Sequence, residues 1–246
     1  MNRVLSLFKR NGKEILRDPV SLIFLLGLPI AMEILFYYLF HSLTAQFEMK
    51  YLAPGLIGFA HAFLALFLAI LVSMDRETAF ITRIYTTPVS APEFILGYFL
   101  VSLPLGLLQS VAILLVGGII EPAFFSLRLL LVLPTSLLSI LLFASLGILI
   151  GSAFSAKAVG GISSILITGQ SVLSGMWFPI EGLSGGFLRL MEALPFKNVS
   201  VLLQRVAMPN GAGGEEVGIP MLIVLAYTVV SLVLSCVFFV RNAKVK

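Results

Sequence analysis

The chain has 246 residues, of which 59% are hydrophobic and 11% are charged, and its mean hydropathy is +1.08. An ordinary soluble domain carries roughly 25% charged residues, so this composition excludes a soluble globular protein and indicates an integral membrane protein. The single cysteine, Cys236, lies in an apolar run and cannot form a disulfide within the chain.

Six apolar runs are long enough to cross a bilayer, which requires about 20 residues of helix. We predict spans at residues 19–40, 54–74, 94–118, 129–151, 159–179 and 217–240. Prolines at positions 29, 104 and 134 are compatible with membrane helices, because neighbouring groups satisfy the freed backbone. The predicted fold is an all-α integral membrane protein that forms a single transmembrane domain over residues 1–246.

The lysines and arginines between the spans indicate how the chain crosses the membrane, because cytoplasmic connections carry an excess of them. With both termini inside, eleven lie on the cytoplasmic side and five on the outer side. The eleven are Arg3, Lys9, Arg10, Lys13, Arg17, Arg76, Arg83, Lys157, Arg241, Lys244 and Lys246; the five are Lys50, Arg128, Arg189, Lys197 and Arg205. The net charge of +4 therefore reflects membrane topology and does not indicate nucleic-acid binding.

Residues 1–18 combine an apolar face with a basic face. On a helical wheel at about 100° per residue, Val4, Leu5, Phe8, Ile15 and Leu16 share one sector, with Leu7 as the exception. The opposite side carries Arg3, Lys9, Arg10, Lys13, Glu14 and Arg17. Such a helix lies in the plane of the lipid headgroups. The alternative is a positive-inside anchor with no further role.

Residues 76–93, RETAFITRIYTTPVSAPE, interrupt the apolar sequence between the second and third spans. A helix over 76–86 would place Phe80, Ile81 and Ile84 in one stripe, with Asp75 capping its start. Prolines 88 and 92 would end it. Two to eight residues are enough to join antiparallel helices, so the pattern predicts either a contact surface for a partner or an interfacial loop packed on lipid.

Ionisable residues inside a span are costly and are functional candidates. Glu33 and His61 both lie about 10 Å below the outer edge, at 1.5 Å of helix rise per residue. They line a substrate path or gate, or they form a buried polar pair that fixes the packing of the first two spans. Gln109 and Gln170 are further candidates for the path, although hydrogen bonding between helices is the commoner role of such residues.

Two further segments allow more than one interpretation. The Gly147-x-x-x-Gly151 pattern permits close helix approach, either within the chain or between two copies.

The long outer link at 180–216 contains glycines over 182–186 and then an apolar face on Phe187, Leu188, Leu190, Met191 and Leu194. Apolar segments too short to span are often re-entrant or interfacial. This link is either a lid over the outer mouth or a helix resting on the outer leaflet.

Three motifs in register with the spans carry a family resemblance. They are Arg17-Asp18-Pro19 leading to Pro29, Asp75-Arg76-Glu77 followed by Pro88-Val89-Ser90, and Ser174-Gly175-Met176-Trp177-Phe178-Pro179 followed by Leu194-Pro195 and Arg205. Over essentially its whole length the chain resembles the membrane subunits of type-2 ABC exporters. It departs from them at residues 79–82, where the family usually has Gly-Thr-Leu-Glu, and at Ser184, near the usual place of a proline.

The resemblance implies a transport subunit driven by ATP, in which residues 76–93 form a coupling helix that seats in a separate ABC ATPase. The expected ATPase-coupling residues are Arg76, Glu77, Phe80, Ile81, Arg83, Ile84, Tyr85 and Pro88. The resemblance also implies an N-terminal interfacial helix, short re-entrant outer helices after the fifth span, and a second copy or homologous membrane subunit. The chain has no G-x-x-x-x-G-K-[ST] phosphate loop, so ATP and Mg are expected in the partner chain, with no cofactor here.

The expected function is outward movement of an amphipathic, drug-like or lipid-like substrate by alternating access, in the cell (inner) membrane. The chain is not expected to be an enzyme itself, since its two histidines lack metal-ligand spacing. The alternative is an ion-gradient-driven secondary transporter, which would typically show internal structural repeats. No such repeat is visible in the sequence.

Overall fold

The computed structural model describes residues 2–77, 90–178, 183–208 and 214–243, and over these ranges the chain is helical with no β-strand. Five helical segments are long and apolar enough to cross a membrane: Pro19–Phe40, Met49–Glu77, Ala91–Ile120, Leu129–Ala153 and Val217–Arg241. They contain five of the six predicted spans. The chain is therefore a multi-pass, all-helical membrane protein.

The remaining predicted span, the fifth at residues 159–179, corresponds to helix α8 (Ala156–Leu173), which is not among those five segments. It is only 18 residues long, and Lys157, Gln170 and several serines and glycines lower its hydropathy. Helix α8 ends earlier than predicted, because the backbone turns at Gly175, whose φ of 70° is in the left-handed region that favours glycine.

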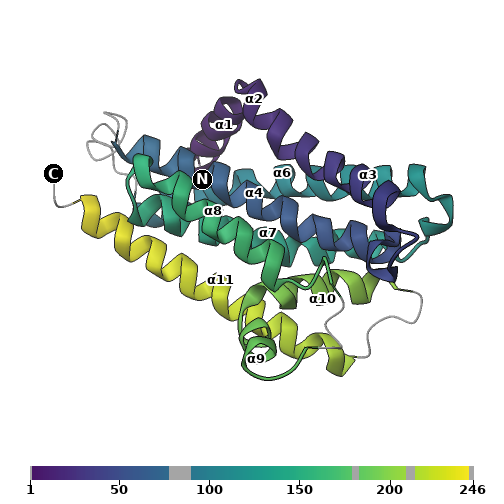
Figure 1. Cartoon of the computed structure of the whole chain (residues 1–246). Coiled ribbons are helices and arrows are strands. Elements are labelled where there is room, and N and C mark those ends of the chain that lie inside the picture. Colours follow the sequence, from purple (N-terminus) through teal and green to yellow (C-terminus); the bar gives the residue numbers. More distant parts are fainter. Residues whose placement is uncertain (1, 78–89, 179–182, 209–213, 244–246) are drawn as a thin grey trace.

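The first span is a broken helix that follows α1 (Asn2–Leu16). It consists of α2 (Pro19–Leu22), a π-helical turn η1 (Ile23–Gly27) and α3 (Leu28–Phe40), and α1 meets α2 at a corner (Figure 1). The Asp18 carboxylate caps α2 by accepting from the Ser21 N–H at 3.1 Å. Proline 29 has no N–H to donate to the preceding turn, which accounts for the irregular hydrogen bonding there.

Helix α1 is amphipathic as predicted, and two residues of the predicted apolar sector pack against the core, but a residue outside that sector is buried more deeply. Leu7, the exception on the wheel, is 8% exposed, whereas Leu5 and Leu16 from the predicted apolar sector are 48% and 65% exposed. A Cβ added to Gly97 would lie 2.6 Å from the Leu7 Cβ, so α1 packs closely on the third span. The helix therefore has two apolar faces, one toward the protein and one left exposed.

Helix α4 (Met49–Glu77) is the centre of the bundle, since 78% of the residues in its apolar 18-residue stretch are buried inside the protein. It packs against α6 (Ala91–Ile120), α7 (Leu129–Ala153) and α8 (Figure 1). At Gly147 an added Cβ would lie 2.8 Å from the Ala65 Cα, and at Gly151 it would lie 2.6 Å from the Ala69 carbonyl oxygen. The glycine pair therefore serves close packing of α7 on α4 within the chain.

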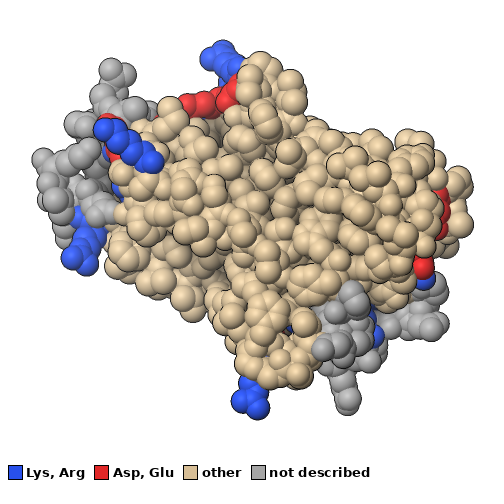
Figure 2. Space-filling view, in the orientation of Figure 1, with Lys and Arg blue, Asp and Glu red and all other residues tan. Residues whose placement is uncertain are grey.

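Two short helices follow α8, namely α9 (Gly186–Ala193) and α10 (Pro195–Ala207), and α9 packs against α10. Helix α10 packs against α11 (Gly214–Ala243) and also contacts α4, α7 and α8. Two short 3₁₀ turns complete the described elements, η2 (Ala45–Phe47) and η3 (Pro122–Phe124). Charged side chains on the face in Figure 2 lie toward the two ends and on projecting elements, which leaves a wide uncharged belt typical of a membrane protein.

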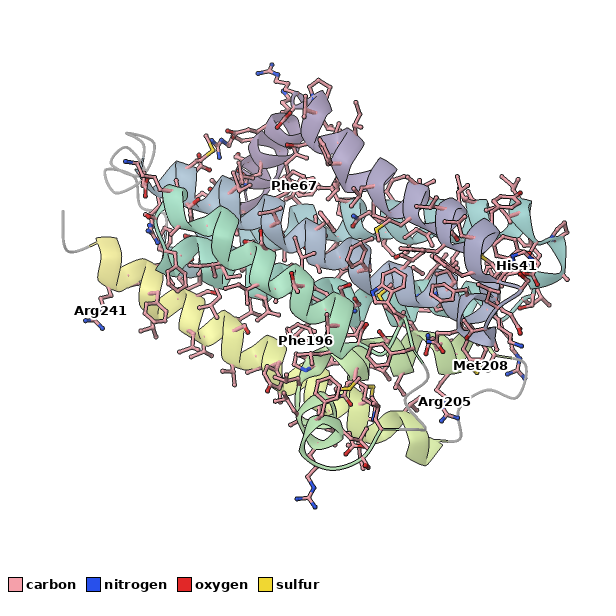
Figure 3. The ribbon with its side chains drawn as sticks, in the orientation of Figure 1. His41, Phe67, Phe196, Arg205, Met208 and Arg241 are labelled. Carbon is pink, nitrogen blue, oxygen red and sulfur yellow. The ribbon has the colours of Figure 1, made fainter. Side chains whose placement is uncertain are left out.

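The two ends of the bundle are formed by different elements. The α1 end contains α1, the last residues of α4, α7 and α11, and the first residues of α6 and α8 (Figure 1). Phe239 of α11 packs there on Phe94 of α6, with ring centroids 4.6 Å apart and ring planes tilted by 34°. Arg241 near the end of α11 lies at the same end of the bundle (Figure 3). The α9 end contains α9, α10, η2 and η3.

Candidate functional site

The candidate site begins at the last three residues of α4, which are Asp75, Arg76 and Glu77. A new helix was predicted to begin at 76, but α4 continues through Glu77 without a break. The other six predicted coupling residues, Phe80, Ile81, Arg83, Ile84, Tyr85 and Pro88, lie outside the described residues. The structure therefore positions the entry to this segment and, at Ser90, its exit.

Asp75 is almost completely buried and ties three helices together at the α1 end. Its carboxylate accepts from both terminal nitrogens of Arg10 in α1, one at 2.6 Å, and from the hydroxyl of Tyr98 in α6. Asp75 is 4% exposed and Tyr98 is fully buried. A two-nitrogen pairing between guanidinium and carboxylate fixes orientation as well as distance. The network therefore holds α1, the end of α4 and the start of α6 in one arrangement.

The charge of Arg10 is shared between two carboxylates, since Glu14 also lies 2.6 Å from the guanidinium. Burial alone would lower the pKa of Arg10, but the hydrogen bond and negative charge of Asp75 more than offset it, and the pKa is raised. Burial raises the pKa of Glu14, and the positive charge of Arg10 partly offsets this increase. Arg10 is therefore a permanently charged connection between α1 and α4.

Arg76 and Glu77 reach the turn between α7 and α8. Arg76 donates to the carbonyl oxygens of Gly151 at 3.1 Å and Phe154 at 2.8 Å, and also to that of Ser152. The Glu77 carboxylate accepts from the Ala156 N–H at 2.9 Å. Both residues were predicted as a polar rim for an ATPase, and the structure shows that both also bind another part of the same chain.

The exit from the 78–89 segment is fixed by a capping box at the start of α6. The Ser90 N–H donates to the Glu93 carboxylate at 2.8 Å, and the Ser90 hydroxyl donates to it at 2.9 Å. The bond from the Ser90 N–H to a glutamate three residues into the helix satisfies an N–H group that a helix start leaves without a partner. Together with the Asp75 network, this cap defines both ends of the segment that was predicted to contact a partner.

His61 lies in the core of α4, α6 and α7 and is fully buried. Its Nε2 lies 3.1 Å from the Gly106 carbonyl oxygen, which can only accept, so Nε2 carries the proton. Its Nδ1 lies 2.8 Å from the Ser139 Oγ. The ring is therefore held from two sides. These contacts suit a packing role, although its predicted place in a substrate path stays a prediction.

Glu33 of α3 is also fully buried, but neither of its carboxyl oxygens has a hydrogen-bond partner among the described residues. It lies beside Gly117 of α6 and Met49 of α4, and no hydrogen bond or ion pair joins it to His61 in the described structure. Glu33 and His61 were predicted at equal depth in the membrane, but they do not form a polar pair. A buried carboxyl without a partner is unfavourable, which is the pattern expected of a group retained for function.

We expect Glu33→Gln to leave the melting temperature of the purified protein unchanged or slightly raised, because no cationic partner is lost. Substrate transport by the assembled complex should fall if Glu33 lies on the path. A stability assay in detergent and a vesicle transport assay measure the two effects. A clear fall in melting temperature would instead show that the carboxylate has a partner and that its role is structural.

The two glutamines differ in how they are satisfied. Gln109 of α6 donates to the carbonyl oxygens of Leu25 at 2.9 Å and Ala60 at 3.0 Å, which joins three helices, although its side-chain oxygen has no partner. Gln170 of α8 is buried with no partner for either amide atom among the described residues, and its amide nitrogen lies beside Gly58 of α4. Gln109 therefore has the interhelical role that is common in membranes.

Sequence reasoning missed the contacts at the α1 end because each joins residues far apart in the chain. Arg10 and Asp75 are 65 positions apart, and Glu77 and Ala156 are 79 apart. A charged residue at the last turn of a span was the available signal, and Asp75 was predicted only as a cap. Among the described residues no group of three His, Cys, Asp or Glu side chains is placed to hold a metal ion.

These features define a multi-pass helical membrane protein whose second and third spans are joined by a segment with firmly held ends. The family model described as ABC-2 type transporter matches residues 2–204. The chain belongs to this family and is a permease component, which confirms the resemblance inferred from its motifs. A search of curated proteins finds no match.

Proposed function

We propose that this chain is the transmembrane subunit of an ATP-driven exporter that moves an amphipathic, drug-like or lipid-like substrate outward by alternating access. The family match over residues 2–204 carries this proposal. Its apolar interior favours such a substrate, because the few buried ionisable groups cannot solvate an ion or sugar chain along a whole path. We place the protein in the cell membrane as six spans, with α8 as the fifth and both termini in the cytoplasm.

The proposed motor is a separate ABC ATPase that binds residues 76–93 at the α1 end. The sequence contains no phosphate-binding loop of its own. The excess of lysine and arginine assigned to the inner side supports a cytoplasmic location for this end. Bonds of Asp75 to Tyr98 and of Ser90 to Glu93 support this proposal, because they hold the helix ends that lead into and out of residues 78–89.

The working unit is proposed to contain two membrane subunits. Helix α8 leaves Ser164, Ile165 and Thr168 exposed on one face, with Ile165 73% exposed. Small polar residues are enriched where membrane helices associate, because their hydroxyls find partners there. This face supports a second copy, or a homologous membrane subunit, packed against α8.

Replacing Ile81 or Ile84 by aspartate is expected to abolish substrate-stimulated ATP turnover, because a charge would replace an apolar anchor in the proposed ATPase contact. Membrane insertion should be unchanged, since neither residue lies in a predicted span. Turnover is measured in the co-purified complex, with Thr86→Asp as the control on the predicted opposite side of the same segment. Unchanged turnover in the isoleucine variants would contradict the proposed contact, and transport abolished by an ionophore instead of by ATP removal would favour a secondary transporter.

A further inference from the structure

The turn between α7 and α8 is fastened to the end of α4 by two neighbouring side chains of opposite charge. Only Phe154 and Ser155 separate the two helices. Arg76 contacts carbonyl oxygens near the end of α7 and in the turn itself, and Glu77 contacts the first N–H group after the turn. One short stretch of α4 therefore holds both sides of the same turn.

Each contact satisfies backbone groups that a helix end leaves without partners. The carbonyl oxygens of Gly151 and Ser152 are at the end of α7, where a cation is favourable because the helix dipole is negative there. The N–H of Ala156 is at the start of α8, where an anion is favourable. Ser155, the N-cap residue of α8, makes no capping side-chain bond, and Glu77 takes over that role from another helix.

The same three helices are also in tight apolar contact directly beneath the turn. Ala69 of α4, Ile150 of α7 and Val159 of α8 form one buried cluster. The close approach of Gly151 to Ala69 lies at the same level. Polar bonds at the surface and packing below them thus join α4, α7 and α8 at one place, adjacent to the segment that is proposed to contact the motor.

We propose that Arg76 and Glu77 are positioning residues that make α4, α7 and α8 move as one unit when the ATPase displaces residues 78–89. The inference rests on the proposed function. It adds that the movement of the ATPase is transmitted to α8 through this pair of side chains, without direct contact between α8 and the ATPase. The α8 face with Ser164 and Thr168 then moves together with α4. Motion at the motor is thereby delivered to the helix proposed to face the second subunit.

The first test separates this role from general stability by comparing matched variants in the complex with its ATPase. Glu77→Ala and Arg76→Ala should reduce the amount of substrate moved per ATP hydrolysed by about tenfold, since charge-assisted hydrogen bonds to the turn are lost. Glu77→Gln should restore most of the ratio, because its amide oxygen still accepts from the Ala156 N–H. Lys157→Ala is the control, since this exposed cation beside the turn makes no hydrogen bond or ion pair to a described residue.

The second test measures movement directly. Cys236 is the only cysteine, so a Cys236→Ser background allows spin labels at Met74→Cys on α4 and Gly161→Cys on α8, two exposed positions. Labelled subunits are diluted into unlabelled ones to isolate the distance within one chain. This distance should be the same in the nucleotide-free and ATP-trapped complexes, and should become state-dependent in Glu77→Ala.

The outcomes distinguish the two proposals. A distance that changes between states in the unmodified chain would overturn the one-unit inference, and so would Glu77→Ala with unaltered distances and an unaltered transport ratio. Transport that does not require ATP in the unmodified complex would overturn the proposed function instead. Size-exclusion chromatography would reveal an insertion or folding defect in Arg76→Ala. In that case the inference is tested by comparing Glu77→Ala with Glu77→Gln.

Discussion

Asp75→Ala is expected to lower the free energy of unfolding by about 2–4 kcal/mol, because breaking a buried ion pair is costly and leaves Arg10 with only the more exposed Glu14 as a counter-charge. The value is below that for a fully buried pair, because the Arg10 side chain is 32% exposed. The change also leaves the buried Tyr98 hydroxyl without this acceptor. Unfolding of the purified protein in detergent, followed by circular dichroism, measures the effect.

Two further variants show whether Asp75 acts through charge. Tyr98→Phe removes one hydrogen bond and should cost about 1 kcal/mol. Arg10→Leu combined with Asp75→Leu replaces the pair by apolar side chains, and should recover much of the stability lost in either single variant. A double variant no more stable than Asp75→Ala would show that the two residues do not act as a pair.

Gly147→Ala is expected to destabilise the protein by about 1–3 kcal/mol, because overpacking a close helix contact forces the helices apart. The added Cβ would lie 2.8 Å from the Ala65 Cα, and backbone cannot rotate away as a flexible side chain can. The melting temperature in detergent measures the loss. Gly161→Ala is the matched control on α8, where a Cβ meets nothing within 4 Å, and it should be neutral or slightly stabilising. Equal effects at both positions would contradict the packing role of Gly147.

The membrane-spanning helices could be predicted because their signal is local. A run of apolar residues reports burial in lipid without reference to any other part of the chain, and five predicted spans lie within helices long and apolar enough to cross a membrane. The weakest apolar run, at 159–179, is also where helix α8 falls outside that set. Its polar residues lower the hydropathy of the run, which was the only property that the prediction used.

The contacts of the site could not be predicted in the same way. Arg10 was placed on a polar face, and the wheel does not distinguish a cation beside lipid headgroups from one that reaches Asp75. Leu7 fell outside the apolar sector, and it is the residue that packs on Gly97. Periodicity identifies one apolar face of a helix, whereas α1 meets both a protein surface and an exposed surface. Only the packing of α1 against α6 separates the two.

The seam between α4 and α7 limits where cargo can travel. Gly147 and Gly151 bring α7 against the backbone of Ala65 and Ala69 so closely that even a methyl group does not fit. A transported molecule many times larger than a methyl group has no route between these two helices while they remain packed. Any corridor through the molecule must run along their outer flanks, and mutational searches for residues that select the cargo belong there.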